Sequence, residues 1–189
     1  MTSTQLTKGM SLLENLLFDF DNVPVKVAAF RKIPKIETSG LSLKGHEEKE
    51  EFTVNLWIAS ELVESGLASF VGEEIEVSEL SKIHYSERMQ PLDRLALLPE
   101  RFYPRIYLSI SEMRRGIRGD PARFDMFNRF TGMFRDILEG RIRKIVRLAS
   151  LGAPTDQTKN LTPEEKILYG ELSSIFYSWR TTMMNLVGE

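Results

Sequence analysis

The feature that most constrains this chain is one uninterrupted helical pattern over residues 121–149. Apolar side chains recur there at spacings of three and four, and Asp120-Pro121 supplies an N-cap followed by proline at the first helical position. At 1.5 Å per residue this helix would be ~43 Å long, whereas ordinary helices average ~11–12 residues. Such a helix is hard to bury within one small monomer, so we expect it to need a partner chain.

Helical signals also fill the rest of the second half. Apolar residues spaced by three and four predict a helix over residues 103–113. The capping box Thr162-Pro163-Glu164-Glu165 predicts the start of another, which should fray near Gly188. Gln90-Pro91 and Leu98-Pro99 each disfavour helix at the residue before the proline. We therefore predict a linker over residues 90–98 and an all-α domain of long helices over residues 99–189.

The first half combines short patterns of both kinds. Periodicity predicts a helix over residues 6–20, strands near residues 23–27, 41–43, 52–56 and 67–71, and a helix over residues 56–65 that ends at Gly66. Ser78 is predicted as the N-cap of a further short helix. The predicted fold class is therefore α+β: a small mixed β/α domain over residues 1–89, followed by the helical domain.

The composition excludes several kinds of chemistry. The chain has no cysteine, which removes disulfides, thiolate metal sites and cysteine nucleophiles. Its two histidines, His46 and His84, lack a paired metal-binding spacing, and no phosphate-binding loop or nucleophile motif occurs. No run approaches the ~18 apolar residues of a membrane span, and a charged signal-peptide start is missing. We expect an intracellular protein without catalytic residues, metal, cofactor or membrane contact.

An aromatic stripe on the longest predicted helix is the first candidate site. Such a stripe fits either the core of the domain or an interface between subunits, and obligate interfaces resemble a core cut in half. Because the helix is long and rich in aromatic residues, we expect the stripe to be a subunit interface. Its members are Phe124, Phe127, Phe130, Phe134 and Ile137.

A basic stripe near the end of the same helix is the second candidate. Four cations are predicted to share one arc of the helix: Arg141, Arg143, Lys144 and Arg147. The apolar side chains between positions 142 and 149 fill the opposite arc. These cations would contact solvent near the negative end of the helix dipole, a partner protein, or phosphates. We favour solvent or a protein partner. Residues 101–147 hold 12 basic and 5 acidic side chains, so direct nucleic-acid binding by this segment stays open as the alternative function.

Three segments, in this order, resemble the GINS family of replication proteins. Phe52-Thr-Val-Asn-Leu-Trp57-Ile-Ala-Ser, with the residues that follow it, resembles the small B domain of GINS subunits. Phe102-Tyr103-Pro104-Arg105-Ile106-Tyr107 is similar to the aromatic start of the helical A domain, and residues 135–145 resemble its long helix ending in R-x-x-K. The order B-then-A is similar to Psf-type subunits in the form found in archaea.

The resemblance implies a non-catalytic scaffold subunit. Such a subunit links the MCM replicative helicase to a RecJ-like partner during DNA replication, and its nucleic-acid contact is weak or indirect. It pairs with a paralogous GINS subunit of reversed domain order as a 2:2 heterotetramer. If the source is archaeal, the location is the cytoplasm, in association with the nucleoid.

Overall fold

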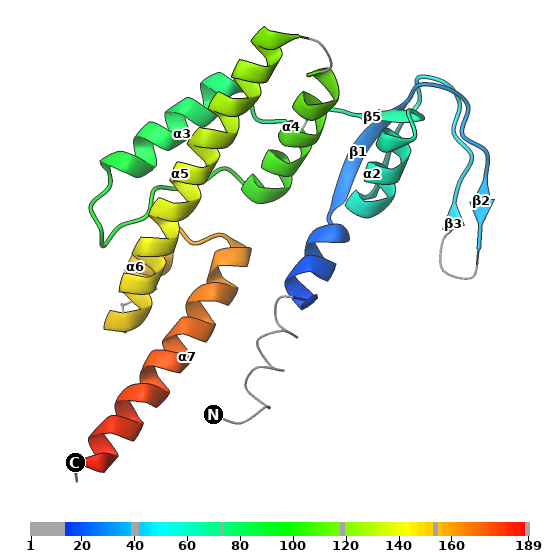
Figure 1. Cartoon of the computed structure of the whole chain (residues 1–189). Helices are drawn as coiled ribbons and strands as arrows, with labels where there is room; N and C mark the ends of the chain where they lie inside the picture. The colour runs from blue at the N-terminus through cyan, green and yellow to red at the C-terminus, as the bar shows by residue number, and fades with distance from the viewer. Residues whose placement is uncertain (1–13, 39–41, 73, 118–119, 153–154, 188–189) are drawn as a thin grey trace. The chain divides into compact units, whose positions relative to one another are not determined.

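The structure is a computed structural model that describes all residues except 1–13, 39–41, 73, 118–119, 153–154 and 188–189 (Figure 1). The chain forms two compact units, Met1–Glu74 and Ile75–Glu189, and each is described by itself. Small strands and short helices precede a set of long helices, so the predicted α+β fold class is confirmed.

The first unit contains a small antiparallel sheet and a helix. Residues 14–21 are helical, while the rest of the helix predicted over residues 6–20 lies outside the described residues. The sheet has the strand order β4-β1-β5, and a separate pair joins β2 to β3. The elements are β1 (Pro24–Ala29), β2 (Ile36–Glu37), β3 (Ser42–Leu43), β4 (Glu51–Asn55), α2 (Leu56–Glu64) and β5 (Ala68–Phe70).

Alternation along β1 explains how this unit closes its core. Val25 and Val27 are fully buried, while Lys26 between them faces outward to an ion pair with Glu51 on β4. Val27 pairs with Phe52 of β4 on one side and with Phe70 of β5 on the other. The helix after β4 adds its own buried side chains, Leu56, Ala59, Leu62 and Val63. The predicted end of α2 is also observed, because Gly66 adopts a positive φ of 67°.

The second unit is built from helices. Within it, α5 packs against α3, α4 and α7, so the longest helix is the axis of the unit. Figure 1 shows α5 running beside α3, with α7 leaving from the lower half of α5. The elements are α3 (Val77–Met89), α4 (Phe102–Gly116), α5 (Pro121–Leu151), α6 (Thr155–Thr158) and α7 (Pro163–Leu186).

Two hydrophobic clusters hold these helices together. The larger joins α3, α4 and the first half of α5, and its buried members are Ile75, Leu80, Leu98, Phe102, Ile106, Phe130 and Ile137. The smaller lies at the second half of α5, where Leu95, Ile145, Leu148 and Leu161 are buried and Tyr169 and Leu172 of α7 pack against them. Among the described residues, the smaller cluster therefore holds α7 through the first half of that helix.

The domain boundary lies earlier than the sequence predicts. The chain divides after Glu74, so α3 belongs to the helical unit and not to a domain over residues 1–89. The segment predicted as linker, residues 90–98, is not helical, as its prolines require, but Leu95, Ala96 and Leu98 are buried in the helical unit. The prolines mark the end of a helix, and the extended segment after it is held by side chains of α5.

Local capping fixes where the long helices begin. Asp120 accepts hydrogen bonds from the backbone N–H groups of Ala122 and Arg123 at the start of α5. Thr162 and Glu165 form the predicted capping box at the start of α7. The predicted N-cap of α3 is one correction: Glu76 is the N-cap, and Ser78 lies inside the helix with its hydroxyl donating to Glu76 Oε2. Among the described helices, none is long and apolar enough to cross a membrane.

Candidate subunit interface and the ionic network behind it

The apolar surface of α7 is the most prominent candidate site. All of α7 is described, and within it Glu165 alone is buried. Trp179 is 61% exposed, Ile175 60% and Leu186 75%. A helix of this length with no buried apolar side chain lacks the packing that normally stabilises helices in proteins. Among the described residues, this face is therefore the candidate surface for an apolar partner.

The exposed side chains lie along one line of the helix. Alternating steps of four and three residues place them as in the seam of a coiled coil, where two helices meet. Leu172 connects this line to the smaller hydrophobic cluster, and the members of the line beyond it are exposed in the part of the chain that the structure describes. We call this line the α7 seam; its members are Leu168, Leu172, Ile175, Trp179, Thr182 and Leu186.

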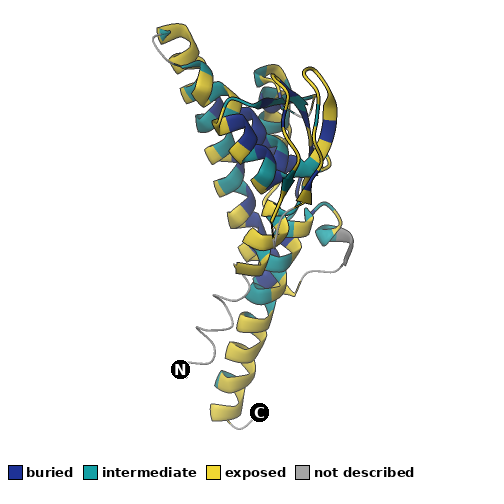
Figure 2. Cartoon of the chain, turned by 90° about the vertical axis from the view of Figure 1, so that its right-hand side faces the viewer, coloured by how far each residue is buried: buried dark blue, intermediate teal, exposed yellow. Residues whose placement is uncertain are grey.

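The seam continues past the end of the helix that supports it. From Arg141, opposite Glu165, α5 runs on for ~15 Å to Leu151, whereas α7 runs ~32 Å from Glu165 to Leu186. Figure 1 shows α7 continuing beyond the end of α5, and in Figure 2 this part of the helix is coloured as exposed. Near the end of α5, Arg180 of α7 donates a hydrogen bond to the carbonyl of Ser150.

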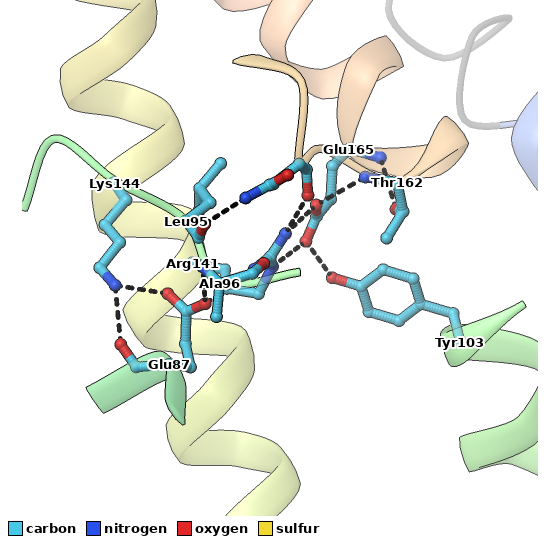
Figure 3. A network of polar contacts seen from close by, with 9 residues as sticks. Glu87, Leu95, Ala96, Tyr103, Arg141, Lys144, Thr162 and Glu165 are labelled. Carbon is cyan, nitrogen blue, oxygen red and sulfur yellow. Dashed lines mark hydrogen bonds and ion pairs between the residues drawn. The ribbon is translucent and has the colours of Figure 1, made fainter. Parts of the chain in front are cut away.

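Behind the seam, a buried ionic network fixes the start of α7 (Figure 3). The guanidinium of Arg141 is fully buried. Its Nε and Nη2 donate to the two carboxylate oxygens of Glu165, at 2.5 and 2.7 Å. Nη1 donates to Glu87 Oε2 at 2.7 Å and to the carbonyl of Ala96, and Nη2 also reaches the carbonyl of Asn160. All five N–H donors of this arginine are thus satisfied.

A second cation completes the network on the side of α3. Lys144 lies one turn after Arg141 and donates to the Glu87 carboxylate at 2.5 Å and to the Glu87 carbonyl at 2.8 Å. The carboxylate of Glu87 also accepts from the backbone N–H of Ala96. Two cations and two carboxylates therefore balance in charge, as buried ions must. The network joins α3, the segment before α4, α5 and the start of α7.

Tyr103 of α4 joins the network at Glu165. Its hydroxyl donates to Glu165 Oε1 at 2.8 Å. Burial raises the pKa of Tyr103 strongly, and the negative charge of Glu165 raises it further, so the phenol stays neutral. For Arg141, burial opposes the charge, but the hydrogen bonds and charges of Glu165 and Glu87 outweigh it and raise the pKa. Arg141 therefore stays charged beside the neutral phenol of Tyr103.

The predicted basic stripe is corrected by this arrangement. Arg141 and Lys144 do not face solvent, a partner or phosphates, because both are buried and paired with carboxylates. Arg143 and Arg147 are exposed, and Arg143 lies 3.8 Å from Glu139. The helical wheel placed the apolar residues on the inner arc, but Ile142 and Val146 are 40% and 38% exposed. Opposite charges on α3 and α7 bring Arg141 and Lys144 to the buried side of the helix, where Ile145 and Leu148 also lie as predicted.

The predicted aromatic stripe is also divided by the structure. Phe130 and Ile137 are buried in the larger cluster of the chain itself, so they are core residues and not an interface. Phe134 is half-buried, and its ring lies near those of Phe102 and Tyr103. Phe124 is 50% exposed and Phe127 is partly exposed near the start of α5. The stripe thus changes from surface to core along the helix.

No local pattern in the sequence marks Glu87 or Tyr103 as members of a site, or predicts the acidic half of the network. Glu165 was recognised for its capping role, and it still performs it: Oε2 accepts from the backbone N–H of Thr162 while it binds Arg141. Pairing with positions far apart in the chain leaves no local signal. The seam of α7 did leave one, in the spacing of Leu168, Leu172, Ile175 and Trp179, which is compatible with core or interface alike.

Other sites offer little chemistry. A cavity of about 350 Å³ lies between α3 and α5, where three cations, Arg88, Arg143 and Lys144, are matched by Glu87, Asp136 and Glu139. With no net charge of either sign, it does not select an ionic ligand. Within the described residues, no group of three His, Cys, Asp or Glu side chains is arranged to hold a metal ion.

Comparison with known proteins agrees with the helical unit. Residues 74–184 match the Sld5 family model, described as the GINS complex protein helical bundle domain. The match begins at the observed boundary between the two units and covers the network and nearly all of α7. No curated protein matches the chain.

Proposed function

This chain belongs to the family of GINS complex proteins, which act in DNA replication, and we propose that it is a non-catalytic scaffold subunit of that complex. In this role it links the MCM replicative helicase to a RecJ-like partner. The family match supports the complex and other GINS subunits as partners. The helicase and the RecJ-like protein are part of the proposal.

We propose further that the subunit is of the archaeal Psf type with the B domain first. The sheet unit precedes the matched helical region, and its segment Trp57-Ile-Ala lies at the start of α2, directly after β4. This order supports the assignment of the sheet unit as the B domain and of the helical unit as the A domain. A paralogue of reversed order would then complete a 2:2 heterotetramer.

The observation that carries the proposal is the seam of α7, whose side chains beyond Leu172 are exposed among the described residues. Its chemistry is apolar and nearly uncharged: between Leu172 and Leu186, Arg180 is the one ionisable side chain apart from Tyr177. The partner that fits is a helix with a matching apolar seam, as another GINS-family subunit would supply. Near the other end of α5, Phe124 is exposed and Phe127 partly exposed, and we propose these two residues as a second contact surface.

The alternative function, direct nucleic-acid binding, has less support than the scaffold function. Of the cations in residues 101–147, Arg141 and Lys144 are buried, and Arg105, Arg115 and Arg123 form ion pairs with nearby carboxylates. Phosphate contacts would have to come from the rest of the segment. A duplex- or single-strand affinity that falls steeply with salt would support this alternative.

A tagged pull-down from native lysate, with identification by mass spectrometry, tests the proposal. Recovery of a second GINS-family subunit together with MCM is the expected result. Light scattering of the purified pair should give about 88 kDa, four chains of about 22 kDa each. Recovery of neither, together with monomers in the light-scattering measurement, would refute the scaffold function.

A further inference from the structure

We propose that the buried Arg141–Glu165 ion pair is a positioning device for the α7 seam. Neither side chain reaches the seam, yet together they set the direction in which α7 leaves the helical unit. Association with a second subunit therefore depends on two residues that do not touch it. This inference rests on the proposed function, because it takes the seam as the face that meets another GINS-family subunit.

The burial of α7 is concentrated in its first turn. Glu165 is the one buried residue of the helix and lies in its first turn. Beyond it, Tyr169 and Leu172 are only partly buried against the smaller cluster. From Glu165 the helix extends ~21 Å to Trp179 and ~32 Å to Leu186. A tilt of roughly 10° at Glu165 would move Leu186 by ~5 Å, about one helical turn.

Such a displacement is enough to disrupt docking between helices. Each side chain of a seam inserts into a hole formed by four residues of the facing helix, so the register must be kept. The cluster around Leu172 attracts the helix but is non-directional, as hydrophobic contact is. A planar guanidinium that donates to both oxygens of one carboxylate does fix a direction.

The rest of the network holds that guanidinium still. Glu87, the Ala96 carbonyl and the Asn160 carbonyl occupy its remaining donors, so Arg141 has no freedom to follow a tilting Glu165. Tyr103 binds Glu165 Oε1 from α4. The carboxylate that begins α7 is thus held from two helices, α4 and α5, that belong to the core of the unit.

The test replaces the pair as a whole. Arg141→Met with Glu165→Met removes one charge of each sign and leaves the Glu87–Lys144 pair intact. Replacing a buried ion pair by apolar residues of similar volume is often neutral for stability, so loss of direction can be measured in a folded chain. Arg141→Lys is the second variant: it keeps the charge but loses the planar fork, and it carries the test if the double replacement unfolds.

The direction of α7 is measured as a distance between two labelled positions in the full chain without a partner. Because the chain has no cysteine, spin labels can be attached at Arg135→Cys on α5 and Ser178→Cys on α7, both exposed positions. We expect a narrow distance distribution in the native chain and a clearly broader one in both variants. Association with the GINS-family subunit recovered in the pull-down, measured by sedimentation, should weaken at least tenfold.

A matched control distinguishes direction from general damage. Glu79 and Arg105 form a partly buried ion pair between α3 and α4, away from α7. Glu79→Met with Arg105→Met should leave both the distance distribution and the association unchanged. If the Arg141 variants keep the native distribution and wild-type association, the positioning role is wrong. If Trp179→Ala leaves association intact, the proposed function fails instead, and the distance measurement still decides the positioning role.

Discussion

Replacing Trp179 by alanine should weaken subunit association while leaving the isolated chain nearly as stable as before. The side chain is 61% exposed in the chain, so roughly 150 Å² of a tryptophan's ~250 Å² is free to be covered by a partner. At ~25 cal/mol per Å², complete cover contributes about 4 kcal/mol and half cover about 2 kcal/mol. We expect association to weaken by ~30-fold or more, since 1.4 kcal/mol is tenfold.

Analytical ultracentrifugation of the chain with its GINS-family partner measures this effect, and calorimetry of the chain alone measures stability. Tyr177→Ala is the matched control: Tyr177 is 73% exposed, but lies two residues from Trp179 and so on the other side of α7. Its loss should change association by less than about twofold, well under the 1.4 kcal/mol of a tenfold change. Equal effects of the two replacements on association, or none, would refute the assignment of the seam.

Three further outcomes follow from the helical unit and from the boundary before it. Because Phe130 is fully buried, Phe130→Ala should lower the free energy of unfolding by ~3–5 kcal/mol and the Tm by roughly 10 °C or more. An unchanged Tm in calorimetry would contradict its place in the core. Above pH ~10 Tyr103 ionises in the unfolded chain, whereas its raised pKa keeps it protonated in the folded chain. The unfolded state then binds fewer protons than the folded state, so the free energy of unfolding falls as pH rises. Urea unfolding of Tyr103→Phe should show this fall reduced by up to ~1.4 kcal/mol per pH unit, and equal slopes would contradict the assignment. Limited digestion with a glutamate-specific protease should cut first near Glu74 or Glu76, at the boundary between the units, and first cleavage within α5 would contradict the division.

Local signals made most of the fold predictable. The capping box at Thr162, the N-cap at Asp120 and the glycine after α2 each mark the end of an element through groups a few residues away. The alternation of Val25 and Val27 likewise predicts the inward face of β1. In these cases the stabilising contacts join residues that are close in the sequence, so the sequence pattern predicts the structure.

The predictions that proved wrong depend on contacts between residues far apart in the sequence. A helical wheel assigns cations to solvent, but Arg141 is buried because Glu87 and Glu165, 54 and 24 residues away, neutralise it. The same pairing makes residues 90–98 part of the helical unit, since Arg141 bonds the carbonyl of Ala96 there. Phe130 and Phe124 share a spacing pattern, and only packing against α4 separates a core ring from an exposed one.

Hydrogen exchange of α7 tests most directly whether its seam meets another subunit. It is compared between the chain alone and the complex recovered with a second GINS-family subunit. The seam side chains Ile175, Trp179 and Leu186 are exposed in the described part of the chain, so the amides of this half of α7 should exchange quickly in the chain alone. In the complex, peptides covering residues 172–186 should become strongly protected, while those from the buried middle of α5 change little. Equal exchange of α7 in both samples would contradict the claim that its seam meets another subunit.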